Sequence, residues 1–177
     1  MSLSPPFGRT LRSLLGALVL ASALGPPPAR AESLQAFHFD DEHELRGWRF
    51  DGVGGIDRGL GFARSGPNNA WLRASHGWNA VWREVPAHGT VCRLWANRRT
   101  SANAPTISLS IIDRDSGIIL GESRTALIGI GDESDWQLSL TDAQGLYPGQ
   151  PLIIRFGFEG NQQDAWVQVD DVTLQCG

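Results

Sequence analysis

Acidic side chains interrupt apolar segments near both ends of the sequence. Asp40 follows the segment Phe37-His38-Phe39, and Asp170 and Asp171 lie inside the apolar segment 166–174. A carboxylate within an apolar strand is costly unless a positive group lies beside it. Hard cations bind clusters of carboxylate and carbonyl oxygens. The sequence therefore predicts that the two terminal strands lie together and are held at these aspartates by a cation.

The two cysteines, Cys92 and Cys176, are the second pair of residues with evident chemistry. In an oxidising compartment, two cysteines in an exported domain favour a disulfide. A bond closing so long a loop would stabilise the fold by about 4 kcal/mol in the chain-entropy model. The alternative is two buried free thiols. A zinc site would need more ligands of this type than the chain supplies.

Short segments of alternating apolar and polar residues position these groups. Ile107, Leu109 and Ile111 alternate with polar residues, and residues 152–158 repeat the pattern, which is typical of half-buried strands. Further strands are expected at 35–40, 47–51, 70–74, 79–85, 91–98, 118–124, 135–140 and 166–175. Helical periodicity is absent after the N-terminal region. The pattern predicts an all-β fold, a two-sheet antiparallel β-sandwich of the jelly-roll type.

Two glycine-containing segments are interpreted as connections between strands. Residues 113–117, Asp-Arg-Asp-Ser-Gly, have the composition of a hairpin turn, with glycine where a left-handed conformation is usually needed. Residues 52–61 are rich in glycine but have no phosphate-loop lysine and no helix after them. We expect both segments to be turns or loops.

The first 31 residues have the pattern of a secretory signal peptide. Arg9 and Arg12 precede an apolar run at 14–24, and Ala29-Arg30-Ala31 forms a small-residue cleavage site before Glu32. The apolar run is too short for a bilayer, which needs about 20 residues. We therefore expect residues 1–31 to be removed, leaving one domain at 32–177 that is secreted or periplasmic and is not inserted in a membrane.

Charge restricts the partners. The chain has no lysine, its 15 basic residues are all arginine, and its formal net charge is −4. Removing the three arginines of the signal makes the mature domain more acidic still. An acidic domain is a poor partner for nucleic acid or an anionic membrane, so both are disfavoured.

The order of short motifs resembles that of the galactose-binding-like jelly-roll group, which includes many carbohydrate-binding modules. The resemblance covers the whole mature chain, and its motifs are, in order, Phe39-Asp40, Gly47-Trp48, Ala63-Arg64-Ser65-Gly66, Ala70-Trp71-Leu72, Gly89-Thr90-Val91, Leu94-Trp95, Trp136 and Val169-Asp170-Asp171-Val172. The group also contains adhesion, receptor-binding and structural domains, so the resemblance implies the fold more strongly than the ligand.

In this group a calcium ion commonly ties the first strand, a neighbouring loop and the last strand together. The resemblance implies that Asp40 and Asp170 or Asp171 would be its ligands, with carbonyl oxygens from residues 65–69. The alternative is that these aspartates cap turns or pair with arginines such as Arg46 or Arg64.

A carbohydrate ligand would need flat aromatic faces and polar groups that bind hydroxyls. If Cys92, Leu94 and Ala96 face inward, then Trp95, Asn97 and Arg99 face outward. Val81 and Val85 similarly leave Trp82 outward. We expect these side chains and Arg155 to form one sugar platform on a concave sheet, with Trp78 and Trp166 as alternative stacking residues at the rim. Trp48, Trp71 and Trp136 are assigned to packing, and core packing of Trp95 stays an alternative.

Catalytic motifs are not recognisable. A serine or cysteine hydrolase needs a nucleophile beside an oriented histidine, and none of the four histidines lies in such a pattern. We therefore predict a non-catalytic, lectin-like domain that binds polysaccharide or another glycan. Two alternatives stay open: an exported structural or adhesion domain that binds a cell-surface protein, and a small hydrolase using two carboxylates among Glu84, Glu122 and Glu159.

Overall fold

The computed structural model describes residues 32–101, 106–126 and 135–177. The predicted signal peptide lies outside these residues. Within the described part, the helix content is one four-residue turn, and no membrane-spanning helix occurs there.

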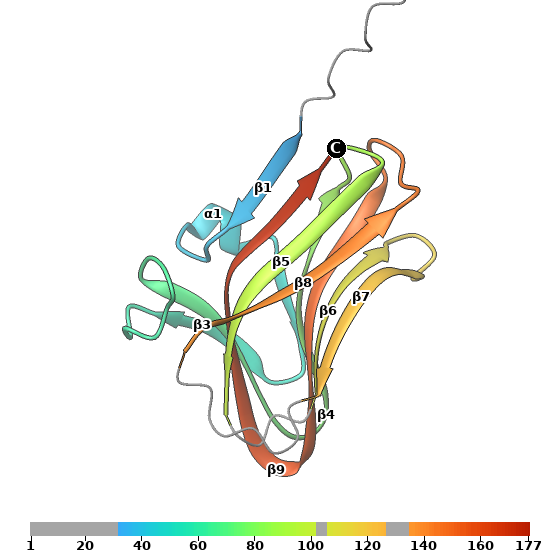
Figure 1. Ribbon diagram of the computed structural model, residues 1–177. Coiled ribbons are helices and arrows are strands. Elements are labelled where there is room, and N and C mark those ends of the chain that lie inside the picture. The colour runs from blue at the N-terminus through green and yellow to red at the C-terminus, as the bar shows by residue number, and fades with distance from the viewer. Residues whose placement is uncertain (1–31, 102–105, 127–134) are drawn as a thin grey trace, which may run out of the picture.

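Antiparallel strands make up about two thirds of the described chain (Figure 1). In chain order the elements are β1 (Ser33–Phe37), α1 (Glu42–Leu45), β2 (Trp48–Asp51), β3 (Gly54–Arg58), β4 (Asn68–Pro86), β5 (Val91–Thr100), β6 (Thr106–Asp113), β7 (Ile119–Ala126), β8 (Gln137–Gln144) and β9 (Pro151–Cys176). The all-β prediction is confirmed, with α1 as an addition that the sequence pattern did not indicate.

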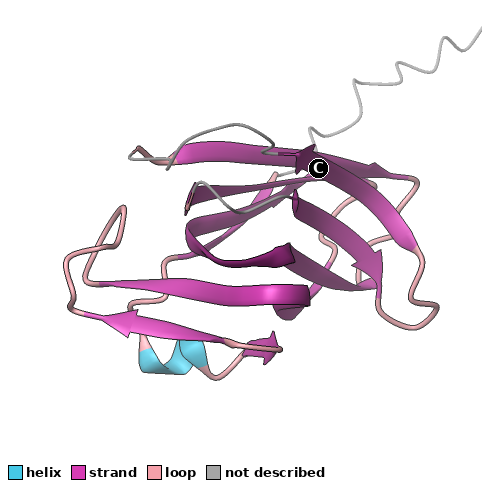
Figure 2. Ribbon diagram, turned by 90° about the horizontal axis from the view of Figure 1, so that it is seen from below, coloured by secondary structure: helices cyan, strands magenta, loops and turns pink. Residues whose placement is uncertain are grey.

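Two long strands, β4 and β9, run through both layers of a sandwich (Figures 1 and 2). The first half of β9 pairs with β6 and with the second half of β4. β2 pairs with β4 and β7 pairs with β6, and we call the layer formed by these five strands sheet I. The second half of β9 pairs with β5, β1 and the first half of β4, and β3 and β8 extend this layer, which we call sheet II. The pairing of β4 with β9 shifts register between residues 74 and 76, where the two strands pass from one layer to the other.

Alternating side chains of the two sheets meet in one core. In sheet I, Leu109 lies opposite Phe156, and in sheet II, Leu94 lies opposite Leu174; all four side chains are buried. Trp48 joins this core and contacts the ring of Phe39 at a centroid distance of 4.9 Å. Its assignment to packing is therefore confirmed.

Four local expectations have different outcomes. The turn at 113–117 is confirmed: the Asp113 carboxylate accepts a hydrogen bond from the Ser116 N–H at 2.8 Å, and Gly117 has φ +70°. The expectation of a loop throughout 52–61 is wrong, because β3 lies within it and pairs with β4. The expectation of separate strands at 70–74 and 79–85 is also wrong, since β4 continues through both. The same holds for β9, which joins two expected strands.

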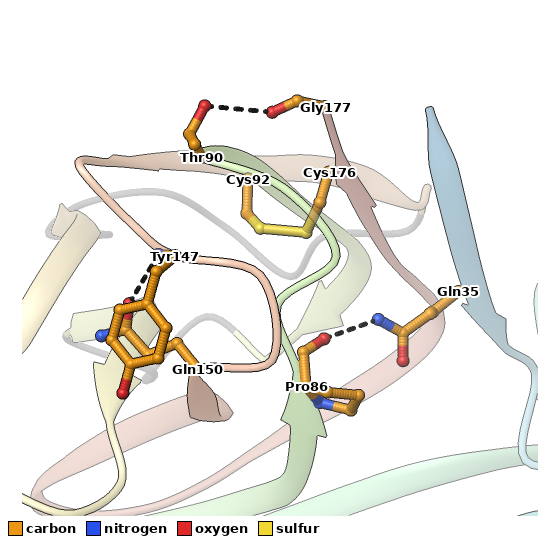
Figure 3. Close-up of a disulfide and its surroundings, with 8 residues drawn as sticks. All are labelled: Gln35, Pro86, Thr90, Cys92, Tyr147, Gln150, Cys176 and Gly177. Carbon is orange, nitrogen blue, oxygen red and sulfur yellow. Dashed lines mark hydrogen bonds between the residues drawn. A yellow bond between two sulfur atoms is a disulfide. The ribbon is translucent and has the colours of Figure 1, made fainter. Parts of the chain in front are cut away.

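The disulfide and the predicted closeness of the two ends of the mature chain are both confirmed (Figure 3). Cys92 and Cys176 are bonded across the β5–β9 pair, with an S–S distance of 2.02 Å. Ser33 of β1 lies opposite Cys176 on the other side of β9. The disulfide therefore fastens the last strand at the residue where the first strand joins it.

Candidate functional site

The outer face of sheet II carries three of the five residues expected in a sugar platform. Cys92, Leu94 and Ala96 of β5 are fully buried, and because strand side chains alternate, Trp95, Asn97 and Arg99 lie on the opposite, outer face. All three are half-buried there. The predicted direction of β5 is therefore right.

The other two residues lie elsewhere, so the expectation of one platform is wrong. Trp82 and Arg155 are opposite each other in the β4–β9 pair of sheet I. The two groups are separated because β4 crosses between the layers after residue 74. Its second half, which carries Trp82, does not share a sheet with β5.

A pocket of about 390 Å³ opens on the outer face of sheet II beside Arg99. Its lining residues are Asp57 from β3, Trp71 and Arg73 from β4, and Trp166 and Gln168 from β9. Trp71 lies opposite Gln168, and Arg73 lies opposite Trp166. The two tryptophans are thus diagonal neighbours on adjacent strands, close enough for large side chains to contact the same ligand.

A chain of hydrogen bonds fixes the polar groups of this pocket. The Asp57 Oδ2 atom accepts hydrogen bonds from Gln168 Nε2 at 3.2 Å and from Asn69 Nδ2 at 3.3 Å. The Gln168 Oε1 atom in turn accepts bonds from Arg99 Nε and Nη2 at 3.0 and 2.6 Å. The amide of Gln168 is therefore oriented by both neighbours, and Asp57 and Arg99 are held in register with it.

Each guanidinium beside the pocket has a partner of its own. Arg73 donates to both carboxylate oxygens of Asp164, at 2.8 and 2.5 Å. Arg99 lies over the ring of Trp136, with its Cζ atom 5.6 Å from the ring centroid, a distance typical of a cation–π contact. Trp136 is half-buried and lies outside the core cluster, so its expected role in core packing stays a prediction, and its contact in the structure is with Arg99.

The expected packing role of Trp71 is wrong, because this side chain lines the pocket. A signal for this was present: its neighbours Ala70 and Leu72 are both apolar, and both are fully buried in the structure. Strand alternation puts the residue between them on the outer face. Trp166 and Gln168 follow the same logic, because Val167 and Val169 are the buried residues of that segment.

The terminal aspartates form a separate cluster that joins β9 to the loop before β4. Asp170 is fully buried, and its Oδ2 atom accepts hydrogen bonds from the backbone N–H groups of Arg64 and Ser65 at 2.8 and 3.0 Å. Its Oδ1 atom accepts one from the N–H of Asp171 at 2.8 Å. Burial raises the pKa of Asp170 to about 6, against the opposing effect of these hydrogen bonds.

Asp171 binds three side chains at once. Its carboxylate accepts from Ser65 Oγ at 2.5 Å and His38 Nδ1 at 2.8 Å on one oxygen, and from Arg64 at 2.5 Å on the other. Burial raises the pKa of Asp171, but the hydrogen bonds from Ser65, His38 and Arg64 outweigh it and leave the pKa below its usual value. The hydrogen bond to Asp171 raises the pKa of His38 in return.

The calcium ion expected at these aspartates stays a prediction. Every carboxylate oxygen of Asp170 and Asp171 accepts a hydrogen bond from an N–H or O–H donor, and the Arg64 guanidinium contacts Asp171. A calcium ion takes six to eight oxygen ligands, so it would have to displace the Arg64 guanidinium from Asp171. No metal-binding group of three or more His, Cys, Asp or Glu residues occurs in the described ranges. Pairing of an aspartate with Arg64, the alternative to the metal, is what the structure shows.

Asp40 lies beside this cluster in the same loop region. Its Oδ1 atom accepts a hydrogen bond from the Asn68 N–H at 3.1 Å. Gly66 has φ +61°, and a Cβ atom there would lie 1.9 Å from Asp40 Oδ2. The three aspartates thus anchor the loop that leads into β4, which carries Trp71.

The fold is similar to that of sugar-binding and adhesin domains of known structure. TmCBM61, solved in complex with β-1,4-galactotriose, has a TM-score of 0.56 and 18% identity, over 72% of this chain and 86% of that one. The CBM22-1 xylan-binding domain of Paenibacillus barcinonensis Xyn10C has a TM-score of 0.53 and 13% identity, over 83% of this chain and 96% of the other. The K1 cleaved adhesin domain of Lys-gingipain from Porphyromonas gingivalis W83 has a TM-score of 0.53 and 11% identity, over 83% and 99%.

No protein-family model and no curated protein matches the sequence. At identities this low, the structural similarity shows the fold alone. It confirms the carbohydrate-binding-module-like jelly roll that the order of motifs suggested.

Proposed function

We propose that this protein is an exported, non-catalytic domain that binds a carbohydrate in the pocket on the outer face of sheet II. The observation that carries the proposal is the pair Trp71 and Trp166 around a pocket that also contains Asp57 and Gln168. Pyranose rings have apolar faces that stack on indoles, while their hydroxyls accept and donate hydrogen bonds at the ring edge. The oriented Gln168 amide and the Asp57 carboxylate offer partners for those hydroxyls.

The size and composition of the pocket support this proposal. A volume of about 390 Å³ lies within the range of small-molecule sites, about 300–1,000 Å³. Two structural neighbours are sugar-binding by their descriptions, one with β-1,4-galactotriose bound and one described as xylan-binding. These two glycans are therefore the first probes for this protein. The buried disulfide supports secretion or export to the periplasm.

The decisive experiment is affinity electrophoresis through gels containing soluble β-1,4-galactan or xylan, followed by a glycan array. We expect retardation by at least one glycan, and an affinity loss of about tenfold or more in Trp71→Ala and in Trp166→Ala, since tryptophans dominate binding energy at such contacts. Tyr147→Ala is the matched control, because it removes an aromatic residue that is 59% exposed and lies outside the pocket, in the connection between β8 and β9. Absence of binding to every glycan on the array would contradict the proposal.

A protein-binding adhesion domain is the second candidate. Its support is the similarity to the K1 adhesin domain and the exposure of Leu34, Leu138 and Leu140 on β1 and β8. Exposed apolar side chains on one sheet are typical of contact surfaces. A stable crosslinked protein partner, together with no response to any glycan, would favour this candidate.

Hydrolysis is tested separately by assaying for new reducing ends after incubation with the same polysaccharides. The three glutamates considered for it have partners: Glu84 contacts Arg114 at 3.4 Å, Glu159 contacts Arg124 at 4.0 Å, and Glu122 accepts from Ser110 Oγ at 3.3 Å. We expect no new reducing ends.

A further inference from the structure

A second pair of tryptophans, Trp78 and Trp82, lies on the same strand as Trp71 but in the other sheet, on the opposite side of the sandwich. Val81 and Val85 of β4 are buried in the core, so Trp78 and Trp82 lie on the outer face of sheet I. We infer that this face is a second carbohydrate-binding surface, one that takes an extended stretch of polysaccharide. This inference goes beyond the pocket and does not require the pocket to bind.

Trp78 lies against the backbone of β9. A Cβ atom on Gly157 would be 1.9 Å from Trp78 Cζ2, so the indole occupies the space that a side chain would otherwise fill. Ala80, which lies opposite Gly157, is also small and is buried. Trp78 nevertheless stays 36% exposed, so part of the indole is open to solvent. An exposed indole held against a sheet can stack on a sugar ring.

Arg155 and Trp82 extend this aromatic surface. The Arg155 Cζ atom lies 5.8 Å from the centroid of the Trp78 ring, and Arg155 is directly opposite Trp82. Trp82 lines a pocket of about 240 Å³ together with Arg49 and Glu84. A guanidinium and a carboxylate beside an indole can bind several hydroxyls of one sugar ring.

Three polar atoms on this face are buried without a partner, namely Trp82 Nε1, Arg155 Nε and Ser108 Oγ. Ser108 lies opposite Gly157, under the same surface, and is fully buried. A buried donor without a partner destabilises the folded protein. If the indole of Trp82 and the guanidinium of Arg155 rotate outward, the hydroxyl groups of a carbohydrate can accept hydrogen bonds from them. An apolar partner has no such acceptors.

The spacing determines the class of ligand. Trp78 and Trp82 are four residues apart on one strand, about 13 Å at the rise of an extended chain. One sugar ring cannot contact both indoles, so the ligand must be an oligosaccharide or polysaccharide segment of several units. The two sides of the domain thus differ: adjacent tryptophans enclose a pocket on sheet II, and separated tryptophans line an open strip on sheet I.

The test compares four proteins by affinity electrophoresis and calorimetry with soluble β-1,4-galactan and xylan and with their oligosaccharides of increasing length. They are the wild type, Trp71→Ala/Trp166→Ala, Trp78→Ala/Trp82→Ala, and the combination of all four substitutions, each checked for an unchanged melting transition. We expect the first double variant to keep polymer binding that grows with oligosaccharide length. Adding Trp78→Ala/Trp82→Ala should reduce this residual binding at least about tenfold.

A conservative variant separates stacking from folding. Gly157→Ala removes neither tryptophan, but its added methyl group displaces the Trp78 indole from the sheet. We therefore expect weaker binding of long oligosaccharides and unchanged binding of short ones. If the Trp71→Ala/Trp166→Ala protein and the protein with all four substitutions bind the polymer with equal affinity, the second surface is overturned. The proposed pocket is not affected by that result. Loss of all binding in Trp78→Ala/Trp82→Ala alone would support the second surface and overturn the proposed pocket instead.

Discussion

At the scale of single residues, Gln168 connects the parts of the pocket. It is a nearly buried side chain whose amide donates to Asp57 and accepts from Arg99. A side chain locked by neighbours on both sides has little rotamer freedom left to lose when a ligand binds. The polar half of the pocket is therefore set before any ligand arrives.

Replacing Gln168 should weaken binding without unfolding the protein. We expect Gln168→Ala to lower glycan affinity about tenfold, because Arg99 loses its acceptor and Asp57 loses a donor. Calorimetric titration with the best glycan measures the effect. Gln175→Ala is the matched control, since Gln175 is on the same strand but bonds to the exposed Glu32. Equal affinities of the two variants would argue against the network.

His38 should titrate above its ordinary pKa of 6.5, because the hydrogen bond to Asp171 favours its protonated form. The folded pKa exceeds the unfolded one, so the stabilisation is complete below pH 6.5 and is lost as pH rises through the folded pKa. NMR titration of the ring protons measures the shift, and Asp171→Asn should lower it. Urea unfolding of His38→Gln should show a weaker pH dependence above pH 6.5 than the wild type.

Chelation tests the terminal aspartates directly. Because Asp170 and Asp171 are satisfied by N–H and O–H donors, we expect a chelator to leave the melting temperature unchanged. Calcium at these residues stays a prediction of the sequence. A melting temperature that rises with added calcium, and no longer rises in Asp170→Ala, would show that a cation displaces Arg64.

At the scale of elements, β4 and β9 determine where each side chain lies. Both strands cross between the sheets, so residues of one strand serve opposite sides of the molecule: Trp71 belongs to the pocket, and Trp82 belongs to the far face. The last residues of β9 lie between β1 and β5. The disulfide is placed at this junction.

Removing the disulfide should destabilise the sandwich without changing the pocket. We expect Cys92→Ala/Cys176→Ala to lose about 2–5 kcal/mol of unfolding free energy, because the bond joins positions 84 apart and restricts the unfolded chain. Urea unfolding followed by tryptophan fluorescence provides the measurement. The folded variant should bind glycans as the wild type does, since neither cysteine lines the pocket. A loss under about 1 kcal/mol would contradict the stabilising role.

At the scale of the whole molecule, the two proposed surfaces lie on opposite outer faces of one rigid sandwich. A ligand bound on one face cannot reach the other without passing around an edge of the sheets. The domain would then hold two separate glycan chains, with no change of its own shape. Bivalent contact raises avidity without any new interaction.

Bridging is therefore expected in solution. Mixing the protein with a soluble polysaccharide that both faces bind should raise turbidity or viscosity at intermediate protein concentrations and not at large excess. Either double variant, with only one face intact, should bind without this effect. Turbidity that persists in both double variants would show that association has another cause.

Local sequence patterns were enough to predict several features of the fold. Alternation identified strands and the outward direction of Trp95, Asn97 and Arg99, because the side of a strand on which a residue lies depends only on its neighbours. The acidic ends indicated that the first and last strands lie together, and the two cysteines indicated the bond that fastens the last strand.

Only the tertiary structure decided which outward residues share a face. The segments 70–74 and 79–85 look alike in sequence, yet they are two halves of β4 in different sheets. The crossing separates Trp82 and Arg155 from Trp95 and brings Trp71 beside Trp166. Alternation carries no information about such a crossing, because a bent strand keeps the same period on both sides of the bend; partner strands far away in the chain determine the sheet to which each half belongs.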